Sequence, residues 1–361
     1  MTQWQRAVND ESARSQKLAR EYVLDGIRRF FKESSYREVE TPLFTPTPDP
    51  EPSIEPFRAE EVLANSKQVE GYLITSPEFA MKRILSAGSG SIFQISKAFR
   101  SLELPGSRHN GEFTILEWYS VGKDYTHLMD ECLALIRFLV AFVARSAQLG
   151  GTALLEKDIP VIDSLLYQDK VYNLQTLEKI SYTEAMERYA GVTEAMLFDQ
   201  SLLSQRMQEL GYEKTSEYSQ LDMLSLLYID KIEPNLGVEG LTILYDFPAD
   251  QAALSRKKVN DPRYAERFEL FLGGMELGNA FTELTDVEEQ KRRLENQLQE
   301  RRATGRRSWE PDRGLLQAME HGMPQTAGIA VGVDRLSMVL LNAPSISDVL
   351  WFPEEDWVFE V

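Results

Sequence analysis

The sequence predicts an α+β fold in which an antiparallel β-sheet is flanked by helices. Three observations lead to this prediction: an amphipathic helix comes first, several strand-like segments follow it, and more strands return after a helical stretch. Such grouping is typical of α+β proteins, whereas a parallel sheet needs strict alternation of strands and helices. With 361 residues, 43% hydrophobic and 27% charged, the chain can form one large domain over 1–361.

The first half of the chain supplies two helices and most of the early strands. Residues 12–33 repeat apolar side chains at helical spacing and predict an amphipathic helix. Residues 35–44 predict a short strand interrupted at Pro42. Residues 124–147 predict a long helix with one strongly apolar face. β-Branched and aromatic residues predict three further strands, at 71–79, 91–100 and 112–121.

The second half begins with a polar segment of helical periodicity. We expect residues 149–231 to form a helical insertion within the domain. The charged segment 288–307 predicts a helix with a largely solvated surface. Strands are expected again at 240–247, 266–278 and 326–333, before a terminal helix.

Charge and composition exclude several classes of protein. The net charge is −18, and such a surface repels polyanions, which argues against tRNA as a partner. No apolar run approaches the roughly 20 residues that a membrane helix needs. The single cysteine, Cys132, lies in an apolar stretch and has no partner for a disulfide, so we expect it to be buried. These features predict a cytoplasmic protein that does not associate with membranes.

The first segment with chemical potential surrounds Arg100. Neither a P-loop nor a dinucleotide-binding glycine fingerprint is present, so any nucleotide phosphates must be held in another way. Arg100 ends a predicted strand and faces a loop that contains Glu103, His109 and Asn110. A guanidinium in this position can present its planar fork to a phosphate. An ordinary charged hairpin is the alternative interpretation.

The second segment places acids in a largely apolar strand. Glu269 and Glu276 are seven residues apart, and Gly273 and Gly274 between them are expected to bend or bulge the strand. Two neighbouring carboxylates suit a Mg²⁺ ion that bridges nucleotide phosphates. Glu283 is a third acid, and a buried carboxylate needs a cation or donors. An exposed strand face is the alternative.

The third segment is GIAVGVDRLSMVLL, a strand followed by a helix. Gly332 would let a ligand approach the backbone, and Asp334 is expected to cap the helix. Arg335 lies in the first turn, where it can meet an anion.

Together, these segments resemble the three signature motifs of class II aminoacyl-tRNA synthetases. The first motif corresponds to the N-terminal helix with YREVETP, the second runs from Phe99 to Glu117, and the third is GVDRL. The resemblance is good over 12–145 and 232–352 and weak over 149–215. It implies the class II catalytic-domain fold. The lysyl branch is closer still, as indicated by TSPEF, RHNGEFTILEWY, ERFELFLGGMELGNAFTEL and GMPQTAGIAVGVDRL.

Within the lysyl branch, the sequence resembles the elongation factor P–lysine ligase family. Lysyl-tRNA synthetases carry an anticodon-binding domain before the first motif, which here begins within about the first 20 residues, so we expect no such domain. IEPNLG and YDFPADQAALSR also resemble the ligases, which activate lysine or β-lysine and transfer it to a lysine of elongation factor P. Ala330 is alanine in the ligases and usually glycine in the synthetases.

The resemblance implies roles for particular residues, with ATP and Mg²⁺ as cofactors and a homodimer as the assembly. Arg100 and Arg335 would be catalytic, holding the α- and γ-phosphates. Glu269 and Glu276 would bind Mg²⁺. The substrate would be bound by Ser76, Pro77, Glu78, Tyr119, Glu283 and Ala330. ATP would be bound by Arg100, Glu103, His109, Asn110, Glu276, Leu277, Asn279, Gly332 and Arg335.

Two departures from the family pattern and two alternative functions accompany this interpretation. The second motif has an extra residue before Glu103, and Ala-Asn-Gly-Phe is replaced by 278–281, Gly-Asn-Ala-Phe, which is expected to reshape the pocket by a methyl group. One alternative is aminoacylation of another acceptor, such as a carrier protein or tRNA. The other is a regulatory paralogue without catalysis, although the intact pairs Arg100–Arg335 and Glu269–Glu276 argue against it.

Overall fold

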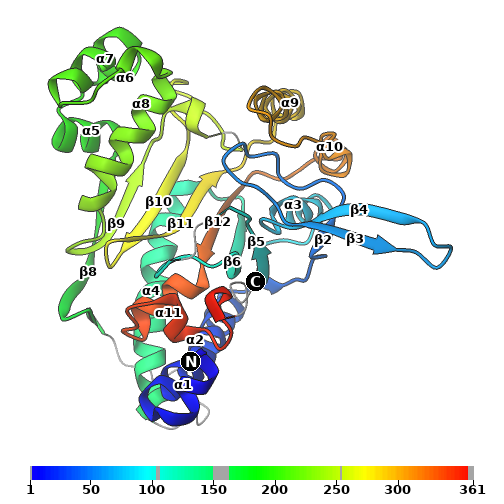
Figure 1. The fold of residues 1–361 in the computed structure, drawn as a ribbon, viewed down its shortest axis with the longest axis vertical. Helices are drawn as coiled ribbons and strands as arrows, with labels where there is room; N and C mark the ends of the chain where they lie inside the picture. The colour runs from blue at the N-terminus through cyan, green and yellow to red at the C-terminus, as the bar shows by residue number, and fades with distance from the viewer. Residues whose placement is uncertain (1, 103–105, 149–161, 253, 357–361) are drawn as a thin grey trace.

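A nine-stranded sheet forms the centre of the computed structural model, which describes residues 2–102, 106–148, 162–252 and 254–356 (Figure 1). Its strands are β1 (Arg37–Glu38), β5 (Ile92–Phe99), β6 (Glu112–Val121), β7 (Ser164–Tyr167), β8 (Lys170–Ser181), β9 (Gly240–Tyr245), β10 (Arg267–Leu272), β11 (Met275–Thr282) and β12 (Thr326–Gly332).

The order of these strands in the sheet is β1-β5-β6-β12-β11-β10-β9-β8-β7. In the sheet order, the neighbouring strands β5, β6, β12, β11 and β10 pair antiparallel. The pairs β1–β5 and β8–β9 are parallel. The α+β prediction is therefore confirmed, and the sheet is mixed at its edges.

Helices cover the sheet and form a separate lobe at one end (Figure 1). They are α1 (Gln3–Asn9), α2 (Glu11–Glu33), α3 (Glu78–Ser86), α4 (Tyr125–Gln148), α5 (Tyr182–Ala190), α6 (Glu194–Leu197), α7 (Gln200–Glu209), α8 (Gln220–Leu227), α9 (Val287–Ala303), α10 (Arg313–Glu320), α11 (Val333–Leu340) and α12 (Ile346–Val349). A small sheet of β2 (Phe44–Thr45), β4 (Gln68–Leu73) and β3 (Arg58–Val62) projects from the body as a hairpin.

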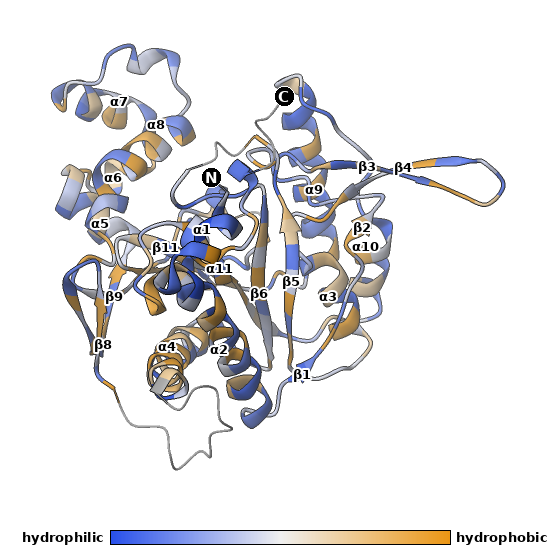
Figure 2. Cartoon of the chain, turned by 60° about the horizontal axis from the view of Figure 1, so that its bottom comes forward, coloured by the Kyte–Doolittle hydropathy of each residue, from blue (hydrophilic) through white to orange (hydrophobic). Residues whose placement is uncertain are grey.

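The main core lies between the sheet and the helix pair α2–α4. Helix α2 begins where the Asp10 side chain accepts hydrogen bonds from two backbone amides of the first turn. Its residues Val23, Ile27 and Phe31 recur every four positions and are fully buried. Figure 2 shows hydrophobic residues along α4 and the strands behind it. Cys132 of α4 is buried in this core, as predicted.

Two predicted strands differ from the structure for local reasons. Strand β4 ends at Leu73, and the predicted strand 71–79 gives way to α3, because the Ser76 hydroxyl accepts a hydrogen bond from the Glu78 amide at 3.0 Å. The predicted strand 266–278 is a hairpin: Gly273 and Gly274 both have positive φ and form its two-residue turn. A bulge follows the turn, because Leu277 of β11 is an extra residue opposite the step from Leu270 to Phe271.

The predicted helical insertion over 149–231 is only partly helical. Residues 149–161 lie outside the described part of the chain. Strands β7 and β8, within 164–181, extend the main sheet, and the helices begin at Tyr182. Burial alternates along part of β8, because one face of this strand packs on the core. A prediction based on helical periodicity therefore missed this strand. Helices α5 to α8 form a second hydrophobic cluster together with Ile180 of β8, Leu244 of β9 and Phe271 of β10.

The charged helix α9 is less solvated than expected. Asp286 caps its first turn, and most of its charged residues face water. Leu294 and Leu298 are nevertheless buried, and so is Arg301. No helix in the described ranges is long and apolar enough to cross a membrane.

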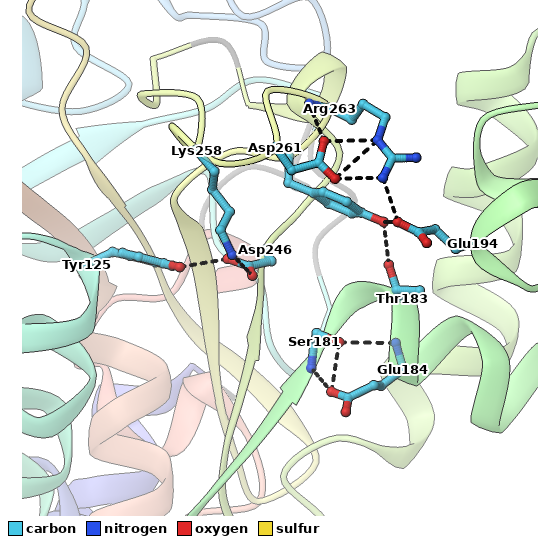
Figure 3. Close-up of polar contacts among 10 residues, drawn as sticks. Tyr125, Ser181, Thr183, Glu184, Glu194, Asp246, Lys258, Asp261 and Arg263 are labelled. Carbon is cyan, nitrogen blue, oxygen red and sulfur yellow. Dashed lines mark hydrogen bonds and ion pairs between the residues drawn. The ribbon is translucent and has the colours of Figure 1, made fainter.

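A polar network attaches the helical lobe to the segment after β9 (Figure 3). The Tyr264 hydroxyl donates to Glu194 at 3.0 Å and bonds Thr183 at 2.9 Å. Arg263 reaches the same Glu194 carboxylate at 2.8 Å. Gln251 also donates to the Tyr182 hydroxyl of α5 at 3.4 Å, so the lobe contacts a residue that lines the cleft described next.

Candidate active site

A cleft of about 620 Å³ opens on the sheet face opposite α2 and α4. Side chains alternate along β6, so Leu116 and Trp118 enter the core whereas Glu117 and Tyr119 face the cleft. Most of the predicted site residues line this cleft: Ser76, Glu78, Arg100, His109, Asn110, Tyr119, Glu269, Glu276, Leu277, Asn279, Glu283, Ala330, Gly332 and Arg335. Pro77 precedes α3 without lining the cleft, and Glu103 lies outside the described residues.

The closed end of the cleft is acidic and contains a buried lysine. Lys82, only 1% exposed, places its ammonium 2.5 Å from Glu78 and 2.6 Å from Glu283. Burial alone would lower the pKa of Lys82, but the carboxylates of Glu283 and Glu78 outweigh it and raise that pKa. Burial raises the pKa of Glu283, against the opposing effect of Lys82. Lys82 binds the Oε2 atom of Glu283, whereas Oε1 accepts no hydrogen bond from the described residues and can receive one from a ligand.

A third carboxylate, Glu117, lies beside this pair. It accepts hydrogen bonds from the Ser76 hydroxyl at 2.5 Å and from the Tyr119 hydroxyl at 3.1 Å. Burial, followed by the charge of Glu78, raises the pKa of Glu117 to about 8. Gly328 faces the Tyr119 ring so closely that a β-carbon there would collide with it. The closed end is therefore a packed pocket with more acids than cations.

The open end of the cleft is organised around Arg335. Its guanidinium donates to the Glu276 carbonyl at 2.9 Å and to the Arg108 carbonyl at 3.3 Å, and it bonds the His109 ring at 2.6 Å. These contacts join the first turn of α11 to β11 and to the loop before β6. A positive group held at a helix N-terminus is well placed for an anionic ligand.

Arg100 occupies the end of β5 on the same side of the cleft. Its guanidinium lies over the Phe113 ring, 5.0 Å from the centroid. Its backbone amide donates to the Gly111 carbonyl at 2.9 Å. Stacking fixes the plane of the guanidinium, which favours two-pronged binding of a phosphate.

Glu269 and Glu276 come from adjacent strands, because the hairpin turn separates them. Glu269 pairs with Arg267 at 2.7 Å and accepts a hydrogen bond from the Tyr228 hydroxyl. Burial raises the pKa of Glu269; Arg267 lowers it, and the Glu276 charge raises it again. The two carboxylates thus lie close enough to repel each other.

Some lining side chains are already engaged with the protein. The Asn110 amide binds the Glu354 and Glu112 backbones, and the Asn279 oxygen accepts from Arg267 at 2.9 Å. Asp334 does not cap α11, because its carboxylate instead accepts hydrogen bonds from the Thr114 amide at 2.8 Å and from Arg20 at 2.5 Å.

The whole chain matches one protein family. A model for tRNA synthetases class II (D, K and N) matches residues 3–356. The chain belongs to this family. It is also 36% identical over 338 residues to an elongation factor P–(R)-β-lysine ligase of Salmonella heidelberg strain SL476, covering 93% of this chain and 94% of the relative. The ligase of the same name from Salmonella typhimurium strain LT2 has the same identity and coverage.

Family membership confirms the predicted class II catalytic domain. The sequence analysis did not identify Glu117, Asp49 and Arg267 as cleft residues, nor Lys82 as the buried cation behind the cleft. A signal for Lys82 existed: with 78–86 as a helix, Glu78 and Lys82 form an i,i+4 pair. The strand predicted over 71–79 hid this spacing.

The carboxylates of the open end fit Mg²⁺ only together with phosphate. The described part of the chain has no group of three or more His, Cys, Asp or Glu that could hold a metal ion. Mg²⁺ in nucleotide enzymes commonly takes one or two carboxylates and completes its octahedron with phosphate oxygens and water. Glu269 and Glu276 provide this pair, and their mutual repulsion would be relieved by a cation.

The two altered residues of 278–281 lie on the same face of β11, because Gly278 and Ala280 are two positions apart and pair with Val331 and Ile329 of β12. Gly278 contributes its backbone to the lining of the cleft, and a β-carbon there would meet the Ala330 carbonyl at 2.7 Å and the Val331 side chain at 2.9 Å. Ala280 is fully buried in the core with α4. The exchange therefore places the methyl group of Ala280 in the core and not in the pocket.

Proposed function

We propose that this chain is an ATP-dependent ligase that activates lysine or β-lysine and transfers it to a lysine of elongation factor P. The observation that carries the proposal is the polarity of the cleft. Its acidic closed end contains Glu283, and its arginine-rich open end contains Glu276 and Arg335. Glu283 follows Glu276 by seven positions of extended chain, which is roughly 23 Å at strand spacing. That length suits a diamino acid placed end to end with ATP.

The first step forms an aminoacyl-adenylate. The substrate carboxylate attacks the α-phosphorus, an oxygen–phosphorus bond forms, and the bond to pyrophosphate breaks. Arg100 would hold the α-phosphate and Arg335 the γ-phosphate, and each stabilises charge that develops on the oxygens. Glu269 and Glu276 would hold the Mg²⁺ that neutralises the phosphates.

The second step transfers the acyl group. The unprotonated ε-amine of the acceptor lysine attacks the carbonyl carbon, AMP leaves, and the amine loses a proton as the amide bond forms. The relatives named above are ligases for elongation factor P, which supports this acceptor. The net charge of −18 supports a protein rather than a nucleic acid as the acceptor.

We also propose a homodimer in which α2 and the segment after β1 supply much of the interface. Leu18 of α2 is 52% exposed, and Leu43 of the segment after β1 is 40% exposed. Each of these two elements therefore presents an apolar side chain that an interface could cover. Sedimentation should give a dimer at micromolar concentration. A fully active monomer would contradict the proposal.

One experiment tests the proposed function. ATP–pyrophosphate exchange is measured with lysine, both β-lysine enantiomers, ornithine and norleucine. The preferred substrate is then incubated with purified elongation factor P, a carrier protein or tRNA, and the products are weighed by mass spectrometry. We expect exchange with a lysine isomer and a mass increase on elongation factor P only. Exchange without that increase would favour another acceptor, and absence of exchange would favour a regulatory paralogue.

A further inference from the structure

The loop before β3 forms one wall of the cleft, and hydrogen bonds from two side chains, Arg301 and Trp309, hold it in place. Asp49 and Ile54 of this loop line the cleft. Arg301 of α9, fully buried, donates to the Glu51 carbonyl at 3.1 Å and to the Ile54 carbonyl at 2.7 Å. The Trp309 indole donates to the Pro48 carbonyl at 2.8 Å. The loop is therefore a fixed wall, and its side chains are positioned before any ligand arrives.

Asp49 of this wall lines the same cleft as Glu78 and Glu283. Its carboxylate accepts a hydrogen bond from the Glu51 amide at 3.1 Å, which fixes the side chain. Burial, together with the neighbouring charges of Glu78 and Glu51, raises the pKa of Asp49 to about 7. Glu78 likewise raises the pKa of Glu283, and both Glu78 and Glu283 are bound to the Lys82 ammonium.

The two acids flanking Glu78 differ in their position along the cleft. The Asp49 loop continues to Glu55, whose carbonyl accepts from the Ser101 amide at 2.7 Å, directly beside Arg100. Glu283 instead follows the last residue of β11, and its amide donates to the first residue of β12. Asp49 thus belongs to the wall that leads to the phosphate end, and Glu283 to the closed end.

We propose that Asp49 is a specificity-determining residue that, with Glu78, receives the amino group nearest the substrate carboxylate, whereas Glu283 receives the distal ammonium. This inference rests on the proposed function, in which the carboxylate must reach the α-phosphate near Arg100. The proximal amino group is only one or two carbons from that carboxylate, so it lies beside the wall that carries Asp49. Lys82 supplies one positive charge to the acids Asp49, Glu78 and Glu283, and a diamino acid supplies the other two.

The test compares Asp49→Asn with Glu283→Gln on substrates that lack one amino group. Asn keeps the oxygen that binds the Glu51 amide and removes only the charge. Exchange kinetics are measured with the preferred diamino acid, with 6-aminohexanoate, which has no proximal amine, and with norleucine, which has no distal one. We expect Asp49→Asn to lower kcat/KM at least tenfold for the diamino acid through KM, and to leave 6-aminohexanoate unchanged. Glu283→Gln should lower kcat/KM for 6-aminohexanoate and spare norleucine.

The controls separate this inference from its alternatives. Glu61→Gln, on the exposed hairpin strand β3, removes one charge elsewhere and should change nothing. An equal loss with 6-aminohexanoate in Asp49→Asn, or a change in the KM of ATP, would overturn the assignment. A wild-type protein that activates no diamino acid would refute the proposed function instead. Calorimetric titration with lysine would then test Asp49 directly, and unchanged affinity in Asp49→Asn would overturn the inference.

Discussion

The ammonium of Lys82 lies 2.6 Å from a carboxylate oxygen of Glu283, and both side chains are almost fully buried. Glu283 comes from the end of β11 and Lys82 from α3, some 200 residues earlier in the chain. The same ammonium binds Glu78. The pocket expected to recognise a substrate cation therefore already contains a cation of the protein, which holds two of its acids in place.

Removing this ammonium should weaken both folding and substrate binding. Lys82→Met should destabilise the protein by about 3–5 kcal/mol, because a buried carboxylate is left without its cation. The double variant Lys82→Met/Glu283→Gln should recover part of that loss, since it removes both charges. Urea unfolding of the wild type, both single variants and the double variant gives the coupling energy. Additive effects, within about 0.5 kcal/mol, would show that the two groups do not interact.

Stability of the empty protein should fall as the pH rises from about 4.5 to about 8. The pKa of Glu117 is raised to about 8 by burial and the charge of Glu78, so the folded state keeps a proton that the unfolded state has already lost. Glu283 contributes in the same direction. Thermal unfolding at pH 5.5, 7 and 8.5 measures the effect. Glu117→Gln should flatten the dependence, and an unchanged dependence in that variant would exclude Glu117 as a source.

Arg335→Ala should reduce adenylate formation at least a hundredfold, because one preorganised charged contact is worth roughly 3 kcal/mol in the transition state. The residue is partly exposed at the cleft mouth, so the fold should persist. ATP–pyrophosphate exchange and circular dichroism are the two measurements. Arg58→Ala, at the exposed start of β3, is the matched control and should remain active. Near-normal exchange in folded Arg335→Ala would contradict the ATP assignment.

Ala330→Gly should shift the preference of the enzyme from β-lysine toward α-lysine. Ala330 lies on β12 opposite Glu117 and Asn279, so its methyl group lines the cleft. One methyl group in a pocket wall changes discrimination by about tenfold. The ratio of kcat/KM for the two isomers is the measurement. Ala280→Gly removes a methyl from the core face of β11 and should cost stability without changing the ratio. An unchanged ratio in Ala330→Gly would contradict the role of this wall.

Several features of the cleft were predictable because they depend on local chemistry. Arg100 ends a strand of alternating pattern, and Arg335 begins an apolar helix, so each could be placed from its neighbours in sequence. The 273–274 glycine pair was recognised as a break, but its identity as a hairpin turn depends on pairing between β10 and β11. Asp334 illustrates the limit: its position suits a helix cap, yet the Thr114 amide and Arg20 compete for the same carboxylate.

Sequence by itself determined the α+β class, the family and most of the residues that line the cleft, because periodicity and motifs are properties of short segments. Tertiary structure decided how those residues are paired. Lys82 between Glu78 and Glu283, the wall that carries Asp49, and the strands β7 and β8 on the main sheet all join segments far apart in the chain. Such contacts depend on strand register and on the burial of charge, and a shift of one residue would turn each side chain to the opposite face of the sheet.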